Sequence, residues 1–193
     1  APCTSNPEVV KIVIDKIRAD LDANPDKRFV PLGMTDGGYC ECEACKALDG
    51  PPITIEGCTL GKPVVRRWYT FLNQVAAAIR ESHPGTIVTT FAYSGCQLPP
   101  ADLALERNIM PFWCYTRSRW FDPEVKRIDL AITRAWLDRV DQIGIYEYYY
   151  GWNLTIPMIY THDMADYLRT VVEQSKNPEA LGMFTEMNAS WGM

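Results

Sequence analysis

The sequence predicts an α/β fold in which helices alternate with parallel strands, and three observations indicate it. Amphipathic segments with helical spacing alternate with short apolar runs along the 193 residues. These runs lack strict two-residue alternation, which is typical of parallel strands that are covered on both faces. Polar and aromatic residues follow the runs, at the strand ends where parallel α/β proteins carry their sites.

The first third of the chain predicts one helix, one strand and one long loop. Ser5 to Glu8 supply a capping side chain, a proline for the first turn and an acid, and apolar residues at helical spacing follow. The apolar run 28–34 predicts a buried strand, although Pro31 weakens it. Residues 37–63 form a loop-like segment that holds four cysteines. A connection of this length is usually functional or cross-linked.

The rest of the chain repeats the alternation. Helical spacing of apolar residues predicts three further helices, at 64–82, 122–140 and 163–175. Runs rich in β-branched and aromatic residues predict four further strands, at 86–93, 109–115, 143–149 and 180–186. Residues 99–107, where another helix would be expected, predict a loop or one short helix.

Two architectures fit this order of elements. One is an open, doubly wound sheet of five strands, and the other is the C-terminal portion of a (β/α)8 TIM-type barrel, a fold of about 250 residues. No G-x-G-x-x-G pattern follows the first strand, and there is no P-loop, so the doubly wound alternative lacks its usual sequence support. We therefore expect a single partial barrel domain over 1–193, with about five parallel strands and a Cys-rich loop at 37–63.

Composition excludes some classes of partner. The net charge of −5 and the lack of a basic run argue against nucleic acid, which binds to a basic face. The apolar stretches are far shorter than the roughly 20 residues that a membrane span needs. Oligomeric state is not indicated by the sequence.

Three carboxylates at predicted strand ends, with aromatic residues around them, suit a sugar substrate. Asp36, Glu147 and Glu186 are the expected catalytic residues, because paired carboxylates act as acid, base or nucleophile in glycoside cleavage. The expected substrate-binding residues are the aromatic and amide side chains near the same strand ends, namely Tyr93, Trp113, Tyr115, Trp152, Asn188 and Trp191.

Each of these residues also has a structural interpretation. Asp36 precedes two glycines and could shape a turn. Glu147 lies inside a strand and could face the helices or pair with an arginine. Core packing is as good an account of Tyr93 as substrate contact is. Arg117 is most simply a solvated charge in a loop.

The cysteines of the long loop have three interpretations. Cys40, Cys42 and Cys45 read C-x-C-x₂-C, and twelve residues separate Cys45 from Cys58. Four thiolates could hold a tetrahedral structural zinc. A disulfide with spare thiols, or an unligated loop, remains open as an alternative. No cofactor is required for cleavage by two carboxylates.

Several segments together resemble a known family. They are Cys3-Thr4-Ser5-Asn6-Pro7-Glu8-Val9, Leu32 to Asp36 leading into Cys40-Glu41-Cys42-Glu43-Ala44-Cys45, Phe71 to Ala76, Ala92-Tyr93, and Ile145 to Tyr149. The chain resembles the glycoside-hydrolase-like (β/α)8 barrels catalogued as domain of unknown function 4838, which include endo-β-N-acetylglucosaminidases. The aspartate followed by C-x-C-x₂-C is the most specific part.

The resemblance implies a bacterial, carbohydrate-degrading protein in an extracellular or periplasmic location, with a glycan containing N-acetylglucosamine or a related sugar as substrate. Related hexosaminidase barrels carry an Asp-Glu pair after the fourth strand, whereas Gly37 follows Asp36 here. Two other functions stay open: a non-catalytic carbohydrate-binding barrel, and a metal-binding module built on the Cys-rich loop.

Overall fold

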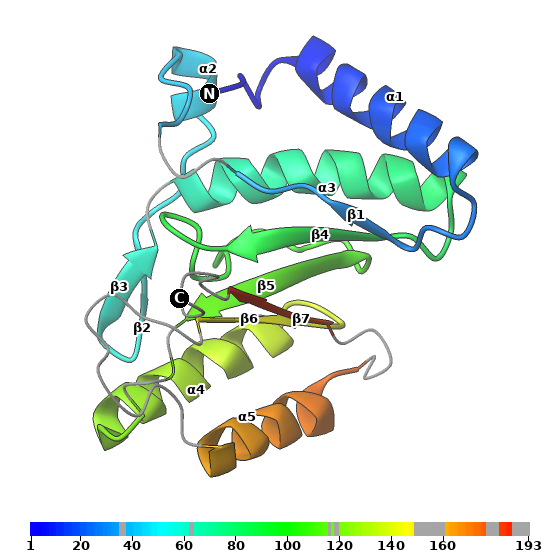
Figure 1. Ribbon diagram of the computed structural model, residues 1–193. Coiled ribbons are helices and arrows are strands. Elements are labelled where there is room, and N and C mark those ends of the chain that lie inside the picture. The colour runs from blue at the N-terminus through cyan, green and yellow to red at the C-terminus, as the bar shows by residue number, and fades with distance from the viewer. Residues whose placement is uncertain are drawn as a thin grey trace, which may run out of the picture.

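The computed structural model describes residues 1–34, 38–61, 64–115, 117, 120–148, 161–176 and 182–186. Its main feature is a five-stranded parallel sheet that curls into a half-barrel, with helices packed along its outside (Figure 1). The helices are α1 (Pro7–Ala23), α2 (Glu43–Lys46), α3 (Val64–Ser82), α4 (Pro123–Leu137) and α5 (Thr161–Gln174). The strands are β1 (Phe29–Pro31), β2 (Ile53–Ile55), β3 (Cys58–Gly61), β4 (Ile87–Ala92), β5 (Ile109–Tyr115), β6 (Gly144–Tyr148) and β7 (Gly182–Glu186).

The strand order distinguishes the two predicted architectures. The sheet runs β1-β4-β5-β6-β7, and every neighbouring pair is parallel. Each strand thus joins beside the one before it, as in a barrel, whereas a doubly wound sheet reverses its order at a switch point. The predicted partial α/β barrel is confirmed. The described residues between β4 and β5 contain no helix, as the irregular sequence there indicated.

The two faces of the sheet have different neighbours. On the helix side, the indole of Trp68 donates to Thr90 Oγ1 at 3.3 Å, which ties α3 to β4. Phe91, the next residue on β4, lies on the other face, where its ring is 5.4 Å from that of Tyr146 and 6.4 Å from that of Phe112. The face turned away from the helices is therefore aromatic.

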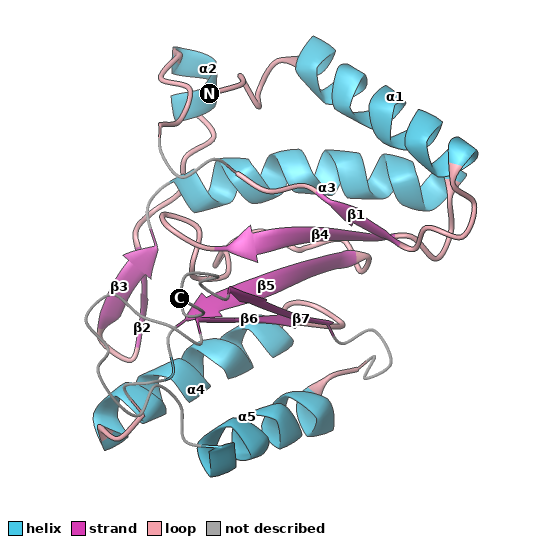
Figure 2. Ribbon diagram, viewed as in Figure 1, coloured by secondary structure: helices cyan, strands magenta, loops and turns pink. Residues whose placement is uncertain are grey.

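Helix α3 runs along one side of the sheet, and α4 and α5 lie on the other side of the curl (Figure 2). The core joins apolar residues of the sheet with those of these helices, and α3 contributes many of them. Leu72, Val75, Ala76 and Ile79 of α3 are completely buried, at the helical spacing that the sequence showed. Helix α1 packs on the outer side of α3. Burial of these apolar residues is the main force that holds the helices on the sheet.

Two helices begin with the same local device. Asn6 caps α1 by accepting a hydrogen bond from the backbone N–H of Glu8, and Asp122 caps α4 by accepting one from that of Glu124. In each helix a proline follows the cap, where its missing N–H costs nothing. These caps fix where the two helices start.

The Cys-rich segment is more ordered than a plain loop. It contains α2 and an antiparallel hairpin of β2 and β3, which the sequence analysis did not predict. Glu56 and Gly57 form the hairpin turn with φ values of 51° and 78°. Two successive residues with positive φ are the signature of a type I′ turn, which suits the twist of a hairpin. Among the described residues, no helix is both long and apolar enough to span a membrane.

Candidate functional site

Four cysteine sulfurs meet beside the start of the chain. Cys3, Cys40, Cys42 and Cys45 all have their Sγ atoms within 4.8 Å of one another, and the group could hold a metal ion. The Sγ of Cys3 lies 3.7 Å from that of Cys42 and 3.7 Å from that of Cys45. All seven cysteines are in described segments, and none forms a disulfide. The disulfide alternative is thus not realised in this structure.

Local structure brings the four cysteines together. Cys42 is the N-cap of α2, and its sulfur accepts a hydrogen bond from the backbone N–H of Cys45 at 3.4 Å. This turn places two sulfurs of the C-x₂-C pair side by side. Cys3 reaches them from the segment before α1, because α1 and β1 run in opposite directions and return the chain to the same end (Figure 1).

The surroundings change the acidity of these thiols. Burial raises the pKa of Cys45, but hydrogen bonds from the hydroxyl and backbone of Ser5 and from neighbouring thiols outweigh it and lower the value to about 6. The backbone N–H of Cys45 is the main cause of the lowered pKa of Cys42. The backbone N–H of Cys42 favours the Cys40 thiolate, yet the thiol of Cys42 and burial raise the pKa of Cys40 to about 11. These hydrogen bonds therefore favour the thiolate at Cys45 more than at Cys40.

The four cysteines that lie together in the structure differ in one member from the four that the sequence predicted as metal ligands. Cys58 was expected as the fourth ligand, but it opens β3 in the hairpin and is not part of the sulfur cluster. Cys3 takes its place. Proximity in sequence favoured Cys58, whereas the path of α1 and β1 brings the more distant Cys3 close.

Helix α3 holds the Cys-rich segment in place. Arg67 is almost completely buried, and its Nη1 donates to the carbonyl of Cys40 at 2.5 Å. Its Nε lies 2.8 Å from Asp49 Oδ1 in an ion pair. An apolar cavity of about 140 Å³ lies beside this anchor, lined in part by Met34, Tyr39 and Trp68. Its apolar walls do not match the polar groups that a sugar needs.

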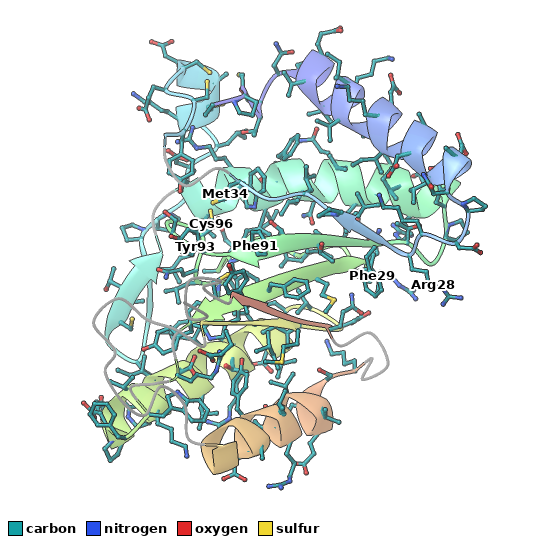
Figure 3. The ribbon with its side chains drawn as sticks, viewed as in Figure 1. Arg28, Phe29, Met34, Phe91, Tyr93 and Cys96 are labelled. Carbon is teal, nitrogen blue, oxygen red and sulfur yellow. The ribbon has the colours of Figure 1, made fainter. Side chains whose placement is uncertain are left out.

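The C-terminal ends of the strands form the other candidate site. Figure 3 shows Met34, Tyr93 and Cys96 gathered at the ends of β1 and β4, and Phe29 and Arg28 at the opposite end of β1. Tyr93 is partly exposed, which leaves it able to contact a ligand. Ser94, the next residue, has a φ of 52°, an uncommon backbone conformation for a residue other than glycine.

Two aromatic residues of β5 have different environments. Trp113 is completely buried on the helix side, and its indole donates to Asp129 Oδ1 at 2.6 Å. Trp113 thus packs inside the protein, as the structural interpretation of such a residue allows, and its role in substrate binding stays a prediction. Tyr115 is partly exposed, and its ring stacks on that of Trp113 at 5.3 Å between centroids.

Glu147 lies in a buried charged cluster and not at an open site. It is completely buried, and its Oε2 accepts a hydrogen bond from Arg117 Nη1 at 2.8 Å. Arg117 also pairs with Asp129 at 3.3 Å and lies over the ring of Tyr167, 3.8 Å from its centroid. Glu147 thus makes the arginine pairing that the sequence also allowed, and its catalytic role stays a prediction; Arg117 is buried, not solvated.

The other expected residues fall wholly or partly outside the described structure. Glu186 is the last residue of β7, where its backbone pairs in register with Tyr148. Outside the described residues lie Asp36, Trp152, Asn188 and Trp191.

Sequence reasoning missed two residues that organise the sites. Cys3 had only its place in the family-like N-terminal segment as a signal. Asp129 had a clearer one, because it lies on the same stripe of α4 as the buried Ile132, Thr133 and Trp136. A carboxylate on such a stripe needs buried partners.

The fold and the sites together define a partial α/β barrel that carries a four-cysteine cluster between the segment before α1 and the start of α2. The chain belongs to the family described as domain of unknown function DUF4838, which matches residues 1–189. No curated protein and no solved structure matches the chain.

Proposed function

We propose that this chain belongs to a glycoside hydrolase that acts on glycans containing N-acetylglucosamine or related sugars, outside the cell or in the periplasm. The observation that supports it best is the sheet itself. Four neighbouring parallel strands, β4 to β7, end at one edge, and this edge of a parallel α/β fold is where such proteins bind substrates. Tyr93 and the end of β7 lie at that edge.

The backbone at Ser94 is a second supporting observation. A positive φ in a residue other than glycine costs free energy and clusters at functional sites. Ser94 follows directly on Tyr93, so the strained position lies beside the partly exposed aromatic ring. An aromatic ring at a strand end suits stacking on the C–H face of a sugar.

Asp36 and Glu186 carry the catalysis in this proposal. Asp36 follows β1 in the sequence and Glu186 is the last residue of β7, so a sugar ring bound across the strand ends would lie between the two outer strands of the sheet. One acts as the acid and the other as base or nucleophile. The metal that the cysteine cluster could hold is a structural zinc in this proposal, since two carboxylates need no metal for this chemistry.

Substitution of these acids in the full protein tests the proposal. Asp36→Asn and Glu186→Gln should each lower the turnover of an aryl N-acetylglucosaminide by about 10²-fold or more, without a change in melting temperature. Glu147→Gln provides a comparison for stability: unlike the other two substitutions, it should lower the melting temperature, because it weakens a buried ion pair. Unchanged turnover in both Asp36→Asn and Glu186→Gln would remove them from the mechanism.

Measuring binding alongside turnover distinguishes a glycoside hydrolase from a non-catalytic carbohydrate-binding barrel. Such a protein would bind glycans, as measured by calorimetry, yet release no product from any substrate. Tyr93→Ala should then weaken binding, because a stacking surface is lost.

A further inference from the structure

The four-cysteine cluster has the dimensions of a metal site. A tetrahedral zinc with Zn–S bonds of about 2.3 Å holds its sulfurs about 3.8 Å apart. The two sulfur–sulfur distances from Cys3, both 3.7 Å, match this edge. The whole set fits within 4.8 Å. Small shifts of side chains would therefore complete a tetrahedron.

The ligand chemistry points to one class of metal. Four thiolates and no carboxylate or imidazole form a soft set that selects zinc over magnesium or calcium. Four protein ligands close the coordination sphere, which is the mark of a structural and not a catalytic zinc. The role of such an ion is to hold chain segments together.

Hydrogen bonds to the sulfurs support thiolates at this position. The backbone N–H of Cys45 donates to the sulfur of Cys42 at 3.4 Å. The hydroxyl of Ser5 lies 3.2 Å from the sulfur of Cys45. Donors of this kind orient metal ligands and spread their negative charge.

We propose that Cys3, Cys40, Cys42 and Cys45 bind one structural zinc ion that fastens the segment before α1 to the segment after β1. Cys58 takes no part in the site. Because 39 positions separate Cys3 from Cys42, the ion closes a long loop that contains α1 and β1. Closing such a loop stabilises the fold chiefly by restricting the unfolded chain. The inference does not depend on the proposed enzymatic activity.

Zinc content and thermal stability test the ligand set. The purified protein should contain one zinc per chain, and Cys3→Ser and Cys45→Ser should each lose it. Cys58→Ser is the matched control, a cysteine of the same segment outside the cluster, and it should keep full zinc. A chelator should lower the melting temperature of the wild type by about 5–10 °C and leave that of Cys3→Ser unchanged.

Thiol labelling tests the same site without any substitution. Cys42 is exposed, yet in the zinc-bound protein it should resist iodoacetamide, together with Cys3, Cys40 and Cys45, until a chelator is added. Labelling of Cys58 should not respond to the chelator. Peptide mass spectrometry measures the extent of labelling at each cysteine. Labelling of Cys42 at the same rate with and without chelator, full zinc in Cys3→Ser, or a disulfide within the four would overturn the proposal.

Discussion

Asp129 joins two indoles and an arginine in one buried cluster. Its two oxygens accept hydrogen bonds from Trp113 at 2.6 Å and from Trp120 at 2.9 Å, and Arg117 lies 3.3 Å away. Burial raises the pKa of Asp129 even though Arg117 and both indoles favour its charged form. The partners come from different segments, so this single side chain connects α4 with β5 and with the segment that follows it.

Removal of this carboxylate should be among the most damaging single changes outside the apolar core. Asp129→Ala leaves two buried indole N–H groups without an acceptor and removes one of the two carboxylates near Arg117. The expected loss is about 3–5 kcal/mol of unfolding free energy, measured by urea denaturation.

Glu124→Ala is the control for this prediction. Glu124 also pairs with an arginine on α4, Arg127, at 2.8 Å, but the pair is exposed to solvent. Water screens such a pair, and the unfolding free energy should stay nearly unchanged. Equal losses in Asp129→Ala and Glu124→Ala would contradict the importance of the buried cluster.

At the scale of elements, β6 depends on a glycine. An added Cβ at Gly144 would lie 2.5 Å from Phe112 Cδ1 and 2.6 Å from two more atoms of the same ring. The ring of Phe112 thus rests directly on the backbone of the neighbouring strand. This close approach fixes how β5 and β6 pack on the aromatic face of the sheet.

Gly144→Ala should therefore displace the Phe112 ring and cost about 1–3 kcal/mol, as overpacking does. Urea denaturation would measure it. Gly182→Ala is a milder control, because its Cβ would meet only the ends of side chains, Phe112 Cζ at 3.0 Å and Met110 Cε at 3.2 Å. The double change Gly144→Ala with Phe112→Leu should recover part of the loss. A larger loss in Gly182→Ala than in Gly144→Ala would contradict this account.

Long periodic elements were predictable from the sequence. The helix expected at 64–82 and the strand expected at 109–115 match α3 and β5 at both ends. Their apolar residues cover enough positions to distinguish the spacing of a helix from that of a strand. Strand β1 is shorter than expected, at three residues, although one ladder bond continues past Pro31, where the backbone N–H of Leu32 donates to the carbonyl of Thr89 at 2.8 Å.

The hairpin and the sulfur cluster were harder to predict, for physical reasons. Strands β2 and β3 are only three and four residues long, too short for a clear alternation. Cys3 joins the cluster through tertiary structure, which spacing along the chain cannot reveal. The sequence allowed Glu147 to pair with an arginine, but it did not indicate Arg117 as that partner. An arginine in a predicted loop by itself indicates solvent exposure.

For the whole molecule, residues 38–61 act as a brace between distant helices. At one end the sulfur cluster joins this segment to the start of the chain, and in the middle Arg67 of α3 binds it. At the other end Glu56, in the hairpin turn, pairs with Arg127 of α4 at 2.5 Å (Figure 1). The segment thus spans from the first helix pair to α4, on the side where the strands end.

Arg67 should be the main anchor of this brace, since it is buried whereas the pair of Arg127 with Glu56 is exposed. Arg67→Met keeps the length of the side chain but removes its bonds to Cys40 and Asp49. The segment 38–61 should then open about ten times more often, equivalent to about 1.4 kcal/mol of local stability. Limited proteolysis under native conditions measures this opening as the rate of cleavage within 38–61.

Arg80→Met provides the comparison, because Arg80 lies on the same helix and pairs with Glu106 at 3.0 Å without contacting the segment. Its cleavage rate within 38–61 should equal that of the wild type. If the segment also shapes the proposed glycan site at the strand ends, Arg67→Met should raise KM with a smaller effect on kcat, since it would disturb binding more than the reacting groups. Equal cleavage rates in Arg67→Met and Arg80→Met would show that Arg67 does not hold the brace.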